Sequence, residues 1–113
     1  MYKILDNLAT HGLVHDNDYD RYHISKDSVS EQKILTFYEA TDEKVENKWL
    51  IIDARILSDY KVNDIHDYLA LIDAASHALD QNHSVVICCG AGISRSNAIA
   101  LGVLIKHFHM GFL

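Results

Sequence analysis

The sequence contains no proline, only two cysteines and five glycines among its 113 residues. It also has no internal repeat, no low-complexity segment and no recognisable linker. A chain of this length without a linker is predicted to form one domain, residues 1–113, with a single hydrophobic core. The absence of proline itself gives no functional information.

Positive charge is also scarce, because 10 Lys and Arg residues stand against 16 Asp and Glu residues, for a formal net charge of −6. This balance leaves no electrostatic footprint for nucleic acid or an anionic membrane, so we expect neither as a partner. The apolar run around residues 99–105 is too short to cross a bilayer. A basic N-terminus followed by an apolar signal segment is missing as well. Because two adjacent cysteines suit a reducing compartment, we expect a cytoplasmic protein.

Eight histidines raise the question of a metal site. His107 and His109 are two positions apart, a spacing that does not share one face of a helix, and the other histidines are scattered. We therefore expect no metal ion and no cofactor.

The most informative segment is an apolar strand that runs into the sequence CGAGISRS, residues 89–96, and then into an apolar helical run. Backbone N–H groups that converge at a helix N-terminus bind an oxyanion, and glycines allow both the tight curl and the close approach of the backbone. Arg95 can hold two oxygens at once, and Cys89 beside it is stabilised as a thiolate nucleophile. The predicted phosphate-binding residues are Gly90, Ala91, Gly92, Ile93, Ser94 and Arg95.

Three further residues of this segment receive predicted roles. The Ser94 hydroxyl is expected to donate to the Cys89 thiolate and make it a better leaving group. Ser96, in the first helical turn, is expected to serve the loop backbone. Cys88 is interpreted as a small buried strand residue, with oxidation against Cys89 as the alternative.

The Cys-x5-Arg spacing resembles the signature of the cysteine-based protein phosphatases, and CGAGISRS looks like their dual-specificity branch. The weaker resemblance extends upstream to Trp49, so it covers roughly residues 49–112. It implies hydrolysis of phosphomonoesters through a cysteinyl-phosphate intermediate. The chain departs from the family at Cys88, where a histidine is usual, and after the loop helix, where C-terminal helices are short or missing.

A phosphatase of this kind needs a general acid, which the family places as an Asp about 30 residues before the nucleophile. Asp59 lies 30 residues before Cys89, within a loop, and is the preferred candidate. Asp53, at the end of an apolar strand, remains an alternative, as does the absence of any dedicated acid. Asp64 is instead predicted to cap the following helix.

The predicted fold is α/β, a single domain with a central, largely parallel sheet flanked by helices. A strand, helix and strand in succession imply a parallel pair, with the phosphate-binding loop at the carboxyl edge of the sheet. The predicted strands are Tyr2–Leu5, Lys33–Phe37, Trp49–Asp53 and Ser84–Cys88, and the predicted helices are Asp64–Leu79 and Ser96–His107.

The expected substrates are proteins phosphorylated on tyrosine and on serine or threonine, because no long loop is present to deepen the site. A nucleotide or RNA 5′-phosphatase and a phosphoinositide phosphatase are alternatives, although they usually need basic loop residues that Gly90, Ala91 and Ile93 do not supply. A catalytically weak phosphate-binding module, a pseudophosphatase, remains a further alternative.

Overall fold

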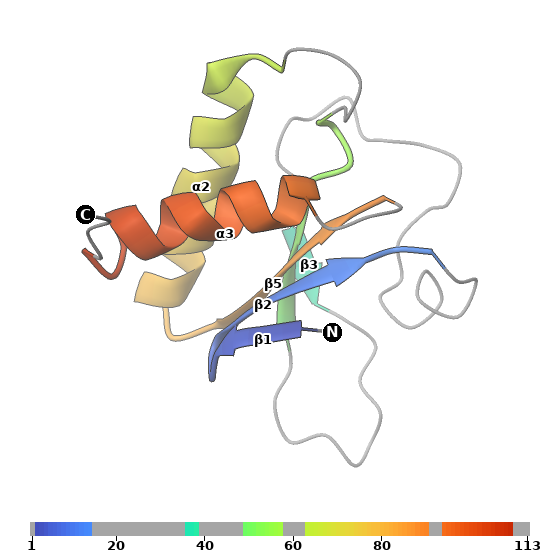
Figure 1. Cartoon of the computed structure of the whole chain (residues 1–113). Helices are drawn as coiled ribbons and strands as arrows, with labels where there is room; N and C mark the ends of the chain where they lie inside the picture. Colours follow the sequence, from blue (N-terminus) through green and yellow to red (C-terminus); the bar gives the residue numbers. More distant parts are fainter. Residues whose placement is uncertain (1, 15–35, 39–48, 58–62, 91–93, 110–113) are drawn as a thin grey trace.

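In the part of the chain that the structure describes, the fold is a small α/β domain in which a sheet carries two helices (Figure 1). Its coordinates come from a computed structural model. For residues 36–38 and residue 94 the backbone alone is described. The described residues are 2–14, 36–38, 49–57, 63–90 and 94–109.

Five strands of the described residues form one sheet, in the spatial order β1-β2-β5-β4-β3. The central strands β2, β5 and β4 run parallel, whereas β1 and β3 each run antiparallel to their neighbour. The sheet is therefore mixed, and the expectation of a largely parallel sheet holds only for its centre. The strand bounds are Tyr2–Leu5 (β1), Leu8–Gly12 (β2), Thr36–Tyr38 (β3), Trp49–Asp53 (β4) and Ser84–Cys89 (β5).

The antiparallel edge formed by β1 follows from its connection to β2. Only Asp6 and Asn7 separate the two strands, and a two-residue connection returns the chain antiparallel, whereas a parallel return needs a crossover of a dozen or more residues. β2 itself was not predicted from the sequence. Its sequence, LATHG, has a single β-branched residue and no Phe, Tyr or Trp, so it lacks the pattern of a typical strand. Its pairing with β5, from Leu8↔Val85 to Gly12↔Cys89, gives it strand geometry.

The other strands agree with the prediction to within a few residues. β1 and β4 have the predicted bounds, and β5 continues one residue further, to Cys89. The predicted strand Lys33–Phe37 overlaps β3, although residues 33–35 lie outside the described part of the chain. β4, α2 and β5 form the predicted strand, helix and strand unit, with the two strands parallel.

The helices of the described ranges are α2, Ile65–Asp80, and α3, Ser94–Lys106, close to the predicted ranges. Asp64 caps α2 as predicted, because its side chain accepts a hydrogen bond from the backbone N–H of His66 at 2.9 Å. Both helices pack on the same face of the sheet and cross each other there (Figure 1). The prediction that helices flank the sheet is therefore confirmed for one face, which α2 and α3 cover.

The crossing of the helices depends on Gly102. A Cβ atom at this position would lie within 2.8 Å of Cγ1 of Ile72, so only a residue without a side chain lets α3 approach α2 this closely. The sequence therefore places its one glycine of α3 at the contact between the helices.

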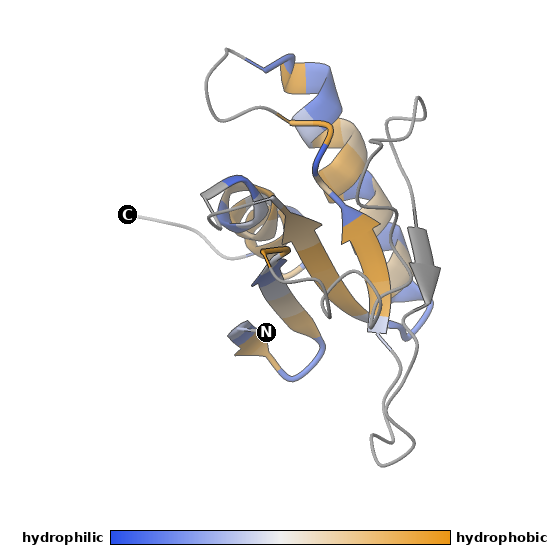
Figure 2. Cartoon of the chain, turned by 90° about the vertical axis from the view of Figure 1, so that its right-hand side faces the viewer, coloured by the Kyte–Doolittle hydropathy of each residue, from blue (hydrophilic) through white to orange (hydrophobic). Residues whose placement is uncertain are grey.

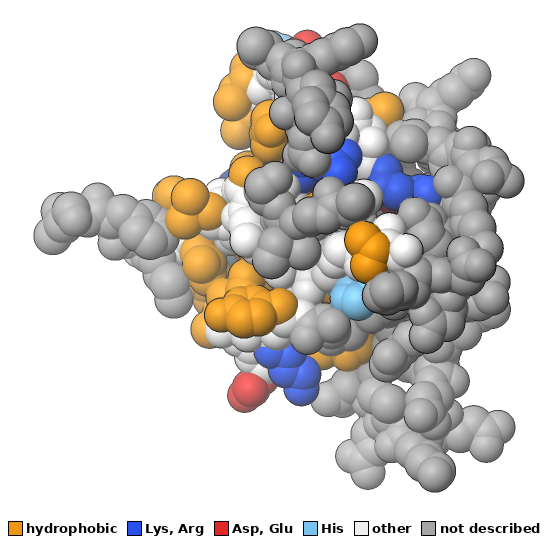
Figure 3. Space-filling model, turned by 45° about the vertical axis from the view of Figure 1, so that its right-hand side comes forward, with side chains coloured by type: hydrophobic (Ala, Val, Ile, Leu, Met, Phe, Trp, Pro, Cys, Tyr) orange, Lys and Arg blue, Asp and Glu red, His pale blue; other side chains and the backbone are white. Residues whose placement is uncertain are grey.

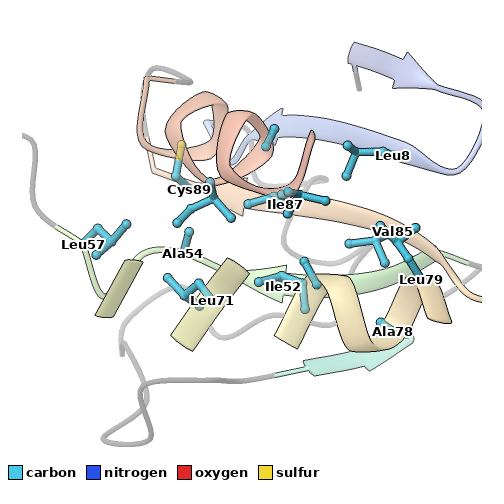
Figure 4. Close-up of a cluster of buried hydrophobic side chains, with 14 residues drawn as sticks. Leu8, Ile52, Ala54, Leu57, Leu71, Ala78, Leu79, Val85, Ile87 and Cys89 are labelled. Atoms are coloured by element: carbon cyan, nitrogen blue, oxygen red, sulfur yellow. The ribbon is translucent and has the colours of Figure 1, made fainter. Parts of the chain in front are cut away.

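Hydrophobic residues occupy both faces of the central strands, whose hydrophobic character is visible in Figure 2. The larger cluster lies between the sheet and the helices (Figure 4), and it includes Leu8, Ile52, Val85, Ile87, Leu71, Leu79, Ile99 and Val103. A second cluster lies on the opposite face and consists of Ala9, Leu13, Trp49, Ile51, Val86 and Cys88. Strands buried on both faces are typical of the centre of a parallel sheet.

Candidate functional site

The carboxyl ends of the three parallel strands meet at one edge of the sheet. Gly12, at the end of β2, pairs with Cys89, at the end of β5. Asp53, at the end of β4, pairs with Cys88. The residues that follow these strands therefore gather at one edge, where ligands bind in open α/β folds.

The two cysteines end β5 on opposite faces of the sheet. Cys89 belongs to the cluster beneath the helices, and its side chain lies between β5 and α3 in Figure 4. Cys88 belongs to the cluster on the other face. Both side chains are buried, and neither cysteine forms a disulfide bond. Because adjacent residues of a strand point to opposite faces, a disulfide bond between Cys88 and Cys89 would require β5 to leave its strand geometry. The structure therefore favours Cys88 as a buried strand residue over an oxidised pair.

Backbone hydrogen bonds hold this end of β5 from both sides. The amide of Leu13 donates to the carbonyl oxygen of Cys89 at 2.8 Å, and the amide of Ala54 donates to that of Cys88 at 2.6 Å. The residues that follow β2 and β4 therefore fix the position from which the chain enters the segment at Gly90.

Arg95, in the first turn of α3, reaches back toward the end of β5. Its Nη2 atom lies 3.0 Å from the position that a Cβ atom would occupy on Gly90. Its Nη1 atom donates a hydrogen bond to the carbonyl oxygen of Leu57 at 2.7 Å. The guanidinium thus lies between Gly90, next to Cys89, and the turn that follows β4.

The turn that follows β4, residues 53–57, carries a buried ion pair. Nε and Nη2 of Arg55 approach the carboxylate of Asp53 at 3.0 and 2.8 Å, and the backbone amide of Arg55 also donates to this carboxylate at 3.0 Å. The two side chains are only 7% and 2% exposed. The amide of Leu57 then donates to the carbonyl oxygen of Ala54 at 3.1 Å, which closes the turn.

The Ser96 side chain is fully buried, and its Oγ atom has no hydrogen-bond partner within the described part of the chain. Its predicted role concerns the backbone of loop residues 91–93, which lie outside that part. For Ser94, only the backbone is described, as the first residue of α3.

Four of the predicted site residues lie outside the described residues. They are the candidate acid Asp59 and the loop residues Ala91, Gly92 and Ile93. The structure thus brings together Cys89, Gly90 and Arg95, and it places the alternative acid Asp53 in the ion pair with Arg55.

Two contributions to the site were not predicted, namely the carbonyl group of Leu57 and the side chain of Arg55. A backbone carbonyl leaves no signal in the residue type. The Asp53 and Arg55 pair could have been recognised as opposite charges two positions apart after a strand, where a turn brings them together.

The described ranges contain no group of three His, Cys, Asp or Glu residues arranged to hold a metal ion. Within the same ranges, no helix has the length and apolar character needed to cross a membrane.

No protein-family model, no curated protein and no solved structure matches this chain. Its function is therefore inferred from the chemistry of its residues and their geometry.

Proposed function

We propose that the chain is a phosphomonoester hydrolase that acts on phosphoproteins through a cysteinyl-phosphate intermediate, with dual specificity for phosphotyrosine and phosphoserine or phosphothreonine. The observation that carries this proposal is the position of Arg95, whose guanidinium lies against Gly90 at the end of the strand that bears Cys89. An arginine that follows a cysteine by six residues only by chance would not be expected to direct its side chain back toward the end of that strand.

In the first step, the Cys89 thiolate attacks phosphorus and the bond from phosphorus to the leaving oxygen breaks. The guanidinium of Arg95 holds two of the non-bridging oxygens, whose negative charge it stabilises. The N–H groups at the N-terminus of α3, which begins at Ser94, supply further donors and a positive dipole.

Asp59 protonates the leaving oxygen in this step. In the second step Asp59 takes a proton from water, the water oxygen attacks phosphorus, and the bond from phosphorus to sulfur breaks. Free phosphate leaves and the thiolate is restored. Asp59 is favoured over Asp53 because both carboxylate oxygens of Asp53 already accept hydrogen bonds from Arg55.

Ser94 is proposed as the hydroxyl that donates to the departing thiolate, as the sequence predicts. Ser96 competes for this role, since its buried hydroxyl lacks a partner within the described ranges. Ser94→Ala and Ser96→Ala identify the donor: the variant that slows the second step accumulates the cysteinyl-phosphate and shows a burst of the first product.

The loop composition favours phosphoproteins over polyanionic ligands. Gly90, Ala91 and Ile93 add no positive charge beyond Arg95, whereas nucleotide and phosphoinositide substrates carry several phosphates. One phosphate on a protein side chain suits a loop, residues 89–96, that contains one arginine.

The proposal is tested by turnover of a small aryl phosphate and its inhibition by vanadate, followed by phosphotyrosine and phosphothreonine peptides. Turnover that vanadate blocks and Cys89→Ser abolishes is the expected result. Vanadate binding without turnover of any substrate would instead identify a catalytically weak phosphate-binding module. The absence of both vanadate binding and turnover would overturn the proposal.

A further inference from the structure

We infer that Asp53 and Arg55 are positioning residues for Arg95, and that they act through the carbonyl group of Leu57. The inference rests on the proposed function, because it concerns how the guanidinium of Arg95 is aimed at a bound phosphate. It gives Asp53 a role that differs from that of a general acid.

The ion pair is the rigid part of this arrangement. Arg55 approaches Asp53 with Nε and Nη2, a two-point contact that fixes the relative orientation of the two groups as well as their distance. Both side chains are almost fully buried, and removing one partner would leave a buried charge uncompensated. The backbone amide of Arg55 donates to the same carboxylate, so the pair also fixes the main chain at the start of the turn.

Backbone hydrogen bonds connect the ion pair to Arg95. The amide of Ala54 is anchored to the carbonyl of Cys88, and the amide of Leu57 donates to the carbonyl of Ala54. The carbonyl of Leu57 then accepts the hydrogen bond from Arg95 at 2.7 Å. No flexible side chain stands between the ion pair and the atom that holds Arg95.

The position of Arg95 needs such a support because its side chain is long. A guanidinium that binds two phosphate oxygens must present its donors in one orientation, and a displacement of about 1 Å can cost about 100-fold in rate. The hydrogen bond to Leu57 uses Nη1, while Nη2 lies against Gly90 beside Cys89. The turn therefore selects which edge of the guanidinium faces the site.

An electrostatic role for Arg55 is the competing explanation. Positively charged side chains do lie close together on the face shown in Figure 3. The charge of Arg55, however, is matched by the carboxylate of Asp53 at 2.8 Å, so the pair adds little field at the site. Its effect is expected through the shape of the turn.

The decisive experiment compares Asp53→Asn in the parent chain with Asp53→Asn in the Arg95→Lys background. Vanadate affinity and kcat/KM for an aryl phosphate should fall about tenfold in the parent, and less than about threefold in the Arg95→Lys background, because coupled residues are not additive. Asp73→Asn is the matched control. It removes an exposed ion pair with Lys106, distant in sequence from the site, and should change neither quantity.

Arg55→Lys is the second variant, in case Asp53→Asn does not fold. Lysine keeps the charge and loses the two-point contact, so the same pattern is expected with a smaller loss. The NMR order parameter of the Arg95 guanidinium should fall in both Asp53→Asn and Arg55→Lys.

Equal losses in the two backgrounds, with an unchanged Arg95 order parameter, would overturn the inference while leaving the proposed function intact. A parent chain that neither binds vanadate nor turns over substrate would overturn the proposed function. In that case, a lower order parameter of the Arg95 guanidinium in Asp53→Asn and Arg55→Lys would still show that the turn positions Arg95. An unchanged order parameter would exclude this positioning.

Discussion

The two faces of the sheet differ at the end of β5, although the two cysteines that mark them are adjacent in the chain. Cys89 lies beneath the helices, where Arg95 returns toward Gly90. Cys88 lies on the opposite face, in register with His11 and Asp53 on the neighbouring strands. The alternation of side chains along a strand thus gives two identical thiols different neighbours.

The comparison teaches that residue type alone does not assign a role at this edge of the sheet. Two arginines lie around the turn of residues 53–57, and one of them, Arg55, is matched by Asp53 while the other reaches the end of β5. The proposed chemistry involves Cys89 and Arg95, on the face that the helices cover. The ion pair between Asp53 and Arg55 instead stabilises the turn.

The largest expected effect separates the two cysteines. Cys89→Ser should lower turnover of an aryl phosphate by more than about 10³-fold, because the serine hydroxyl is not ionised, while vanadate binding is retained. Cys88→Ser should keep turnover within about tenfold of the parent, since the Cys88 side chain lies on the other face. Steady-state kinetics and vanadate inhibition measure both. A larger loss in Cys88→Ser than in Cys89→Ser would reverse the assignment.

The second prediction concerns the two arginines. Arg95→Lys should lower kcat/KM by about 10²- to 10³-fold, because a point charge does not reproduce a two-point contact with the transition state. Arg55→Lys should cost far less, because it acts on the site only through the turn. Kinetics close to those of the parent in Arg95→Lys would show that phosphate binds elsewhere.

The third prediction distinguishes the two aspartates by leaving group. Asp59→Asn should slow alkyl phosphates, which are poor leaving groups, by about 10²-fold or more, and activated aryl phosphates far less. Asp53→Asn should slow both classes to a similar extent, because it disturbs the position of Arg95 and not the proton transfer. Rates measured across a series of leaving groups decide between them. Sensitivity to the leaving group in Asp53→Asn alone would make Asp53 the acid.

The smallest effect is expected on stability, away from the sheet edge. Gly102→Ala should destabilise the fold by about 1 kcal/mol, because the clash with Ile72 outweighs the gain in helix propensity. Ile72→Val, which removes the nearest methyl group, should recover part of this loss. Denaturant unfolding measures the change, and turnover at low temperature should be unaffected. A variant more stable than the parent would mean that the helices cross elsewhere.

Several features of the fold were predictable because their signals are local. The apolar face of α2 and the side chain of Asp64 fix where that helix begins, and the continuous apolar runs of β4 and β5 identify buried strands. A strand, helix and strand in succession then imply a parallel pair. The spacing from Cys89 to Arg95 is likewise contained in the chain itself.

Other features depend on partners that are distant in sequence. β2 has no strand pattern of its own and becomes a strand because β5 lies beside it. The hydrogen bond from Arg95 to Leu57 joins residues 38 positions apart. No local pattern encodes such contacts.

The sequence by itself therefore determined the helices, the central parallel pair and the candidate residues from Cys89 to Arg95, since each depends on near neighbours in the chain. The tertiary structure alone decided that β2 lies beside β5 in a mixed sheet, that the helices cover the face that carries Cys89, and that Arg95 reaches the carbonyl group of Leu57. The physical reason is that the neighbours of a strand determine both its backbone pairing and the burial of its side chains. Which strands become neighbours depends on the burial of apolar area, to which residues distant in sequence contribute.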